Sequence, residues 1–237
     1  MITRIVAYQA RDAPMSRVEV PTLDVALILS YGPTMRVDGR TMSSFLVGMW
    51  DRPALTEHDG DAHGLQIDLT PAVAYALVGG RMDELTNTVI PLDDLDVVDV
   101  ERLLETDGGA AADELASVVQ RGPRVSREVD WAYRELKREP ATRIARIAEE
   151  IGWSRSHLVD RFRREVGLSP KRFARLVRFR SAFDRLGSAP LAIVAAECGY
   201  ADQSHLTHEF REMAGDTPSA YARSVSISPE PVEAAVH

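Results

Sequence analysis

The sequence has little cysteine, no long apolar run and none of the common catalytic motifs. Its one cysteine, Cys198, cannot form a disulfide within the chain. The first residues, MITRIVAYQARD, lack the apolar core of a secretory signal peptide. Apolar runs such as VALIL are far shorter than the about 20 residues that cross a bilayer. We therefore expect a cytoplasmic protein with no membrane span.

Enzymatic chemistry has little support in the sequence. No nucleophile elbow, phosphate-binding loop or zinc-ligand spacing occurs, so no catalytic residue, metal site or cofactor is predicted. Residues 57–63 (EHDGDAH) gather two histidines and three acids, which leaves a metal site as an alternative. Because their spacing matches no defined ligand set, an acidic surface loop is the favoured interpretation.

The net charge of −8 conceals two halves of opposite sign. Residues 1–119 carry 8 basic and 20 acidic side chains, whereas residues 120–223 carry 20 basic and 14 acidic ones. A polyanion would be repelled by the first half and attracted by the second. Any contact with nucleic acid is therefore expected in the C-terminal half.

The pattern of the sequence also changes along the chain. Between residues 18 and 69, short runs rich in Val, Ile and Leu alternate with turn sequences such as YGP, VDG and HDG, which predicts a small β-sandwich or barrel. Helices are expected at 71–79, where Pro71 suits a first turn, and at 92–105 and 110–120. Gly122-Pro123 is the expected domain boundary, followed by a mainly helical region.

The role of the N-terminal half stays open at this stage. Its residues Tyr31, Met35, Met49 and Trp50 suit a packed core and a ligand pocket equally well. One side of the acidic stretch 92–105 is apolar, which suits a dimer face or packing on the strands. A small-molecule effector and a homodimer are therefore both hypotheses for this half.

The C-terminal half contains one pattern twice, at residues 152–170 (GWSRSHLVDRFRREVGLSP) and 199–218 (GYADQSHLTHEFREMAGDTP). Each copy has a short helix, a glycine suited to positive φ, an aromatic residue and a second amphipathic helix. The copies differ by one residue inserted in the turn. Ser154 and Asp202 are placed to cap the second helices. This arrangement predicts two helix-turn-helix units.

A single copy would fit an ordinary helical hairpin as well as a DNA-binding unit. Two copies in a basic segment favour DNA binding. The segment between them, from Ser169 to Gly187, predicts a helix of about 17 residues, or roughly 25 Å. That length can place two recognition helices in successive major grooves of double-stranded DNA, about 34 Å apart.

Residues 123–223 resemble the DNA-binding domain of the AraC/XylS family of bacterial transcription regulators. The resemblance rests on AEEIGWSRSHLVDRFRREVGLSPKRF and VAAECGYADQSHLTHEFREMAGDTPSAY. It implies an all-α region of about seven helices, promoter binding, RNA polymerase as a partner and no catalysis. The N-terminal half is similar to the β-rich, cupin-like region of one subset of the family, through FLVGMWDRPALTEHDG, GLQIDLTP and ELTNTVIPLDDL.

The resemblance assigns DNA contacts in the first recognition helix. The base-facing positions are Ser156, Val159 and Asp160. Arg155 and Arg163 are placed near the sugar-phosphate backbone of the DNA. Val159 can contact a thymine methyl group, and Asp160 can accept from cytosine N4. A carboxylate near DNA phosphates is electrostatically unfavourable. A salt bridge from Asp160 to an arginine three or four residues further along the helix is therefore as well supported as the contact with cytosine.

In the second recognition helix, the equivalent positions are Gln203, Ser204, Thr207 and His208. Gln203 can read adenine with two hydrogen bonds, and His208 can donate to guanine or to a phosphate. Basic residues expected near phosphates are Arg155, Arg163, Arg164, Lys171, Arg172 and Arg211.

The repeated histidines His157 and His205 adjoin packed leucines in both copies, so a structural role is favoured for them. Three parts are predicted: a regulatory or dimerising domain at 1–122, an AraC-type DNA-binding domain at 123–224 and a flexible tail at 225–237. The predicted function is sequence-specific regulation of transcription. The alternative is a cupin-type metal-dependent enzyme or small-molecule binder with a helical appendage.

Overall fold

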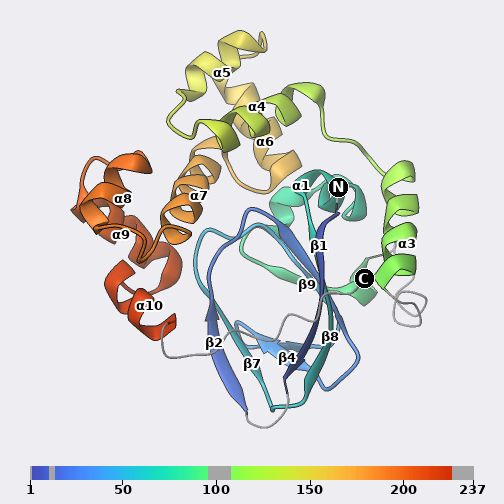
Figure 1. Cartoon of the computed structure of the whole chain (residues 1–237). Coiled ribbons are helices and arrows are strands. Elements are labelled where there is room, and N and C mark those ends of the chain that lie inside the picture. Colours follow the sequence, from blue (N-terminus) through green and yellow to red (C-terminus); the bar gives the residue numbers. More distant parts are fainter. Residues whose placement is uncertain (1, 11–13, 96–107, 226–237) are drawn as a thin grey trace.

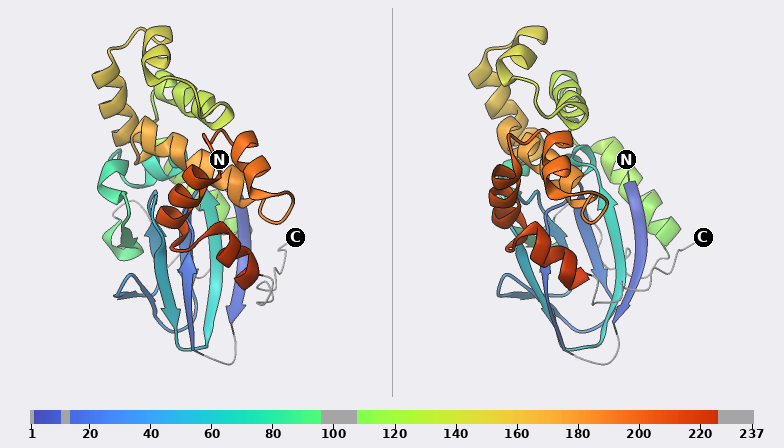
Figure 2. Two further views of the ribbon diagram at one scale, coloured as in Figure 1. Left: turned by 90° about the vertical axis from the view of Figure 1, so that its left-hand side faces the viewer. Right: turned by 60° about the vertical axis from the view of Figure 1, so that its left-hand side comes forward.

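A computed structural model describes residues 2–10, 14–95 and 108–225. The N-terminal part is a β-sandwich, and helices lie over one end of it and along two sides (Figures 1 and 2). The five-stranded sheet has the order β1-β8-β3-β6-β9. Its strands are β1 (Ile2–Ala10), β3 (Val25–Ser30), β6 (Phe45–Val47), β8 (Ala62–Leu69) and β9 (Val89–Pro91).

The second sheet has four strands in the order β2-β7-β4-β5. They are β2 (Met15–Glu19), β4 (Met35–Val37), β5 (Arg40–Met42) and β7 (Ala54–His58). All the strand pairs of both sheets are antiparallel among the described residues. The expectation of a small sandwich is confirmed.

The two faces of the larger sheet belong to different cores because side chains alternate along a strand. Leu27 of β3 pairs with Ile67 of β8, and both pack toward the helices. Ile28, the next residue, packs with Trp50 in the core between the sheets. Met35 also lies in that core and Met49 in the helix-side core, whereas Tyr31 is exposed.

Within its described residues, the N-terminal part also has two helices and two short 3-10 turns. They are α1 (Pro71–Leu77), η1 (Met82–Leu85), η2 (Leu92–Asp94) and α3 (Gly108–Arg121). Pro71 begins α1 as expected. Of the helix expected at 92–105, the structure gives only the short turn η2, and residues 96–107, with the dimer face suggested there, lie outside the described residues.

Residues 123–225 form seven α-helices, as expected. They are α4 (Arg127–Arg138), α5 (Ile144–Glu150), α6 (Arg155–Val166), α7 (Pro170–Phe183), α8 (Leu191–Glu197), α9 (Gln203–Ala214) and α10 (Pro218–Val225). The connecting helix α7 has 14 residues, fewer than predicted. It ends early because the amides of Arg185 and Leu186 bond to carbonyls three residues back, which tightens the chain into turns.

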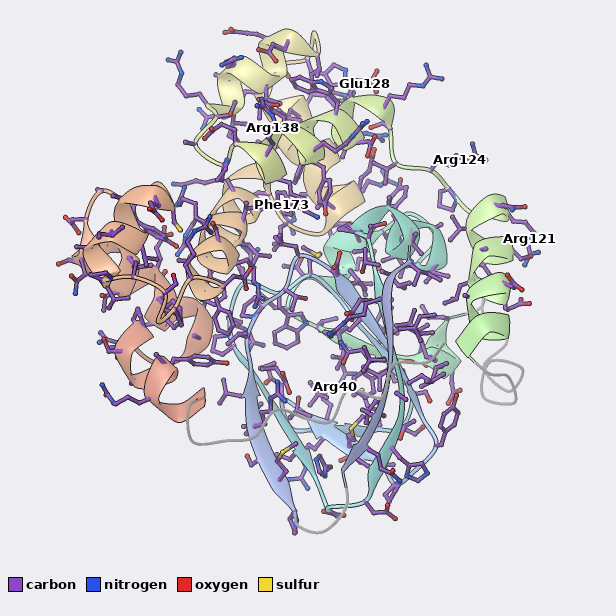
Figure 3. All side chains as sticks on the ribbon, viewed as in Figure 1. Arg40, Arg121, Arg124, Glu128, Arg138 and Phe173 are labelled. Atoms are coloured by element: carbon purple, nitrogen blue, oxygen red, sulfur yellow. The ribbon has the colours of Figure 1, made fainter. Side chains whose placement is uncertain are left out.

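The β-sandwich and the helical region share one buried core. The core that contains Leu27 and Ile67 continues through α1 and η1 to Phe162 of α6 and Phe173 of α7 (Figure 3). The boundary at Gly122-Pro123 therefore separates two patterns of secondary structure, and independent folding of the two parts stays a prediction. No helix in the described ranges has the length and apolarity needed to cross a membrane.

Candidate nucleic-acid interface

The first helix-turn-helix unit consists of α5 and α6. The turn between them contains Gly152, whose φ of 73° lies in the left-handed region. Ser154 then caps α6 by accepting a hydrogen bond from the backbone N–H of His157 at 3.2 Å. Helix α6 ends at Gly167, which is also left-handed.

The second unit, α8 and α9, repeats this geometry with one added residue. Gly199 has a φ of 77°, and Asp202 caps α9 by accepting from the N–H of His205 at 2.7 Å. The insertion adds Ala201 between the turn aromatic and the cap. Both predicted caps are confirmed.

Helix α7 joins the two units through aromatic packing. Near its start, Phe173 packs on Phe162 of α6 with ring centroids 5.7 Å apart. Near its end, Phe179 packs on Phe210 of α9 at 5.2 Å. All four rings are fully buried. One helix therefore anchors both recognition helices and limits their movement relative to each other.

The repeated histidines pack against the turn aromatics. The His157 ring lies edge-on to Trp153 at 4.5 Å between centroids, and His205 takes the same position on Tyr200 at 5.3 Å. His205 Nδ1 also accepts from the N–H of Ala201. These contacts agree with the structural interpretation, because each histidine fixes the turn that precedes its recognition helix.

The residues predicted to contact DNA lie along the outer surfaces of α6 and α9. On α6, Arg155, Ser156, Asp160 and Arg163 are exposed, and Val159 is partly buried. Asp160 forms no ion pair with a neighbouring arginine within the described part of the chain, so the salt-bridge alternative is not realised. Its carboxylate instead points an unpaired negative charge outward from a recognition helix.

On α9, Gln203, Ser204, His208 and Arg211 are exposed, and Thr207 is partly buried. The Thr207 hydroxyl donates to the backbone carbonyl of Gln203 at 2.8 Å. It therefore does not bond to the side-chain amide of Gln203. His208 Nε2 lies 3.4 Å from a Glu212 oxygen. The exposed side chains thus offer amide, hydroxyl and imidazole groups on one helix.

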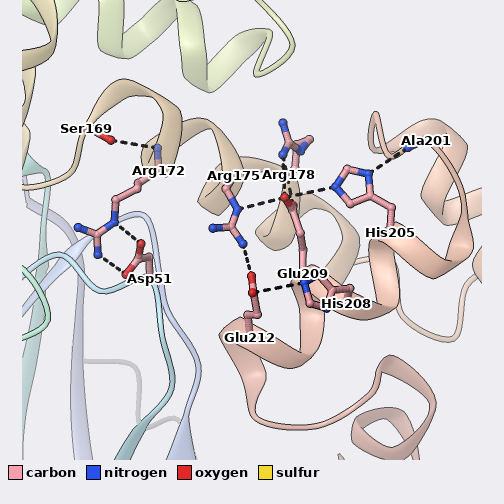
Figure 4. A network of polar contacts seen from close by, with 10 residues as sticks. All are labelled: Asp51, Ser169, Arg172, Arg175, Arg178, Ala201, His205, His208, Glu209 and Glu212. Carbon is pink, nitrogen blue, oxygen red and sulfur yellow. Dashed lines mark hydrogen bonds and ion pairs between the residues drawn. The ribbon is translucent and has the colours of Figure 1, made fainter.

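A buried carboxylate that the sequence reasoning missed holds α9 on α7 (Figure 4). Glu209 is 6% exposed and accepts hydrogen bonds from Arg175 at 3.0 Å and Arg178 at 3.2 Å. His205 Nε2 lies 3.4 Å from the same carboxylate. Burial would lower the pKa of Arg175, but Glu209 and Glu212 outweigh it and raise that pKa. The sequence feature that could have identified Glu209 is its place as an acid on the buried side of the amphipathic helix α9.

The basic residues expected near phosphates divide into two groups. Within the described residues, Arg155, Arg163, Arg164, Lys171 and Arg211 have no ion-pair partner and are exposed. Arg172 is different, because Asp51 of the β-sandwich holds it with two charge-assisted hydrogen bonds.

The acidic segment 57–63 forms the end of β7, a turn and the start of β8. Its groups interact with neighbours: Glu57 with Arg36 at 3.5 Å, and His58 Nδ1 with the N–H of Gly60 at 3.1 Å. Among the residues described, no group of three or more potential ligands is placed to hold a metal ion. The metal-site alternative is therefore not favoured.

Comparison with known proteins agrees with this geometry. A family model described as a helix-turn-helix domain matches residues 147–224. An uncharacterised helix-turn-helix-type transcriptional regulator of Haemophilus influenzae is 33% identical over 86 residues, which cover 35% of this chain and 29% of that protein. An AraC-like transcription regulator of Streptomyces antibioticus is 36% identical over 94 residues, 37% of this chain and 30% of that protein.

The whole fold is similar to ToxT of Vibrio cholerae. The TM-score is 0.54 at 12% identity, over 93% of this chain and 97% of ToxT, which shows a common fold alone. Two capped helix pairs joined by one helix define a double helix-turn-helix protein. The C-terminal region matches a helix-turn-helix domain family and is similar to an AraC-like transcription regulator.

Proposed function

We propose that the chain is a sequence-specific regulator of transcription that binds double-stranded DNA with α6 and α9 in successive major grooves. The observation that carries this proposal is the pair of equally capped helix-turn-helix units fixed to one helix, α7. Recognition helices of this kind place their first turns against base edges. The matched relatives are transcription regulators, of which this chain spans 29% and 30%, so the activity of the whole protein is a proposal.

Each recognition helix has a proposed set of contacts. On α6, Ser156, Val159 and Asp160 face the bases, and Arg155 and Arg163 meet phosphates. On α9, Gln203 reads adenine, with Ser204, Thr207, His208 and Arg211 around it. All of these side chains except the partly buried Val159 and Thr207 are exposed, which supports the assignment.

The N-terminal part has a proposed regulatory role. A ToxT structure of the same fold contains an unsaturated fatty acid, and a small-molecule effector is the corresponding proposal here. A recess of about 60 Å³ near Trp50 and Arg52 is too small for such a ligand without rearrangement. Homodimerisation through this part and contact with RNA polymerase complete the proposal.

The test is a binding-site selection with the full-length chain. Purified protein is mixed with genomic fragments at fixed salt, and the retained DNA is sequenced. We expect a bipartite motif whose halves lie about one helical turn apart. Retention of no fragment above a non-specific background, or a motif with a single half, would contradict two-groove recognition.

A further inference from the structure

The first recognition helix is packed between the helical region and the β-sandwich. Helix α6 contacts α4 and α5 on one side, and α1 and η1 of the N-terminal part on the other. Its last residue Val166, together with Gly167 and Leu168, is buried. The corner between α6 and α7 therefore lies inside the contact between the two parts.

Gly167 fits this corner closely. Its φ of 97° is in the left-handed region, and a Cβ added there would lie 3.1 Å from the Met49 Cβ and 3.2 Å from the Met82 carbonyl oxygen. The Gly167 carbonyl accepts a hydrogen bond from the Thr86 hydroxyl. Thr86 follows η1 directly, so this bond joins the end of α6 to the N-terminal part.

A second contact holds the start of α7. Both carboxylate oxygens of Asp51 accept from the Arg172 guanidinium (Figure 4). Asn87 orients Asp51: its side-chain amide donates to Asp51 Oδ1 at 3.0 Å, and its oxygen accepts from the Asp51 N–H at 3.0 Å. Asn87 itself has a φ of 53°, a conformation that asparagine tolerates better than most residues.

The second recognition helix has no equivalent hydrogen-bonded attachment among the described residues, although Phe210, Met213 and Ala214 of α9 belong to the core that the helical region shares with the β-sandwich. The α8–α9 turn and Leu206 belong to a separate core, formed with Ala182, Val194, Ala195, Cys198 and Tyr200, that contains no residue of the β-sandwich. No hydrogen bond or ion pair between described residues joins α9 to the N-terminal part. The two units therefore differ in their hydrogen bonds and ion pairs to the N-terminal part.

We propose that Thr86 and Asp51 are positioning residues that set the orientation of α6 at the α6–α7 corner, so that base reading by α6, and not by α9, depends on the β-sandwich. This inference rests on the proposed DNA-binding function. It makes the N-terminal part a determinant of specificity at one half of the binding site. A change of conformation near Thr86 or Asn87 then alters one half-site and leaves the other intact.

The test compares Thr86→Val and Asp51→Asn with the wild-type full-length chain. Both changes nearly preserve volume and remove a contact at the corner. Glu57→Gln is the matched control, because it removes one negative charge from an exposed ion pair of the same part. Released Arg172 would add only sequence-independent attraction to phosphates. The readout is therefore the ratio between preferred and non-preferred bases at each half-site.

We expect both corner variants to reduce this ratio roughly tenfold in the α6 half, within the usual range of coupling between sites. The α9 half should be unchanged, Glu57→Gln should behave as wild type, and Asp51→Glu should restore much of the ratio. Equal loss in both halves, or no loss, would overturn the proposal.

Hydrogen exchange separates this proposal from the proposed function. Amides of residues 163–168 should exchange faster in both corner variants, while those of α9 keep their wild-type rates. Unchanged exchange at the corner refutes the positioning role. If the wild-type chain binds no DNA, the proposed function and the half-site claim fail together, and exchange still decides whether Thr86 and Asp51 hold α6.

Discussion

Ser154 and Asp202 hold equivalent places in the two helix-turn-helix units: each side chain accepts a hydrogen bond from the backbone N–H of the histidine three residues later. Asp202 makes the shorter bond, at 2.7 Å against 3.2 Å, and adds a negative charge at the positive end of the α9 dipole. The extra residue in the second turn leaves this geometry intact. Both recognition helices therefore start in the same way.

Removing either cap should destabilise the protein. Ser154→Ala and Asp202→Ala each leave a free N–H at a helix start, which costs about 1 kcal/mol. The free energy of unfolding from urea titration measures this loss. Ser219→Ala, at an exposed position of α10, is the control and should change stability little. Wild-type stability in both cap variants would show that water replaces the caps at no cost.

Gln203→Ala should act on one half of the binding site. Loss of a bidentate contact to adenine costs about 1 to 3 kcal/mol and relaxes the base preference there. Val159→Ala should act more weakly and on the other half, because it removes only apolar contact. Binding-site selection at fixed salt measures both. If both variants reduce the base preference at the same base pairs, the two units do not read separate grooves.

Phe210→Ala tests the framework that the units share. The Phe210 ring is fully buried and packs on Phe179, so its loss leaves a cavity and costs about 3 to 5 kcal/mol of stability. Circular dichroism during thermal unfolding measures this. DNA binding should fall without any positional pattern, in contrast to Gln203→Ala. A stable Phe210→Ala protein with an altered base preference would contradict the framework role.

The unpaired arginines should control the salt dependence of binding. Arg155→Ala, Arg163→Ala and Arg211→Ala should each reduce the slope of log affinity against log salt by about 1, because each removes one phosphate contact. Arg81→Ala is the control, since Arg81 pairs with Glu84 in the N-terminal part. Equal slopes for Arg211→Ala and Arg81→Ala would show that Arg211 makes no contact with a DNA phosphate.

The local features of the helical region could be predicted from the sequence. Gly152, Gly199, Ser154 and Asp202 act within a few residues of their own positions, so spacing alone identified the turns and caps. The strands β1 and β9 lie outside residues 18–69 and were not predicted. Each is defined by its partner, as β1 is by β8, and the identity of a partner distant in the sequence is not a local property.

The contacts between the parts were beyond sequence reasoning for the same reason. Arg172 was expected near phosphates because it is basic and close to α6, but Asp51, 121 residues away, holds it. Glu209 was missed because an acid on a helix is most often exposed, and only the fold brings Arg175 and Arg178 to it. Residues close together in the sequence were enough to predict the two helix-turn-helix units. Contacts between residues far apart in the sequence determine how these units are attached to the rest of the protein.

The Asp51–Arg172 pair should make stability depend on pH. Burial would raise the pKa of Asp51, but hydrogen bonds from Arg172 and Asn87 outweigh it and lower that pKa below its ordinary value. A carboxyl with a lowered folded pKa stabilises the protein above its unfolded pKa of about 3.9, and this stabilisation is lost as pH falls through the folded pKa. The Arg172 side chain is 38% exposed, which weakens the pair through solvent screening.

Asp51→Asn should therefore cost about 1 to 2 kcal/mol near neutral pH, the lower part of the range for hydrogen bonds to charged groups. The difference from wild type should shrink as the pH falls below about 4, because protonated Asp51 resembles asparagine. Urea unfolding at a series of pH values measures this. Glu57→Gln, in an exposed pair, should cost less than about 1 kcal/mol. A constant difference between wild type and Asp51→Asn at all pH values would show that the contribution of Asp51 does not depend on its charge.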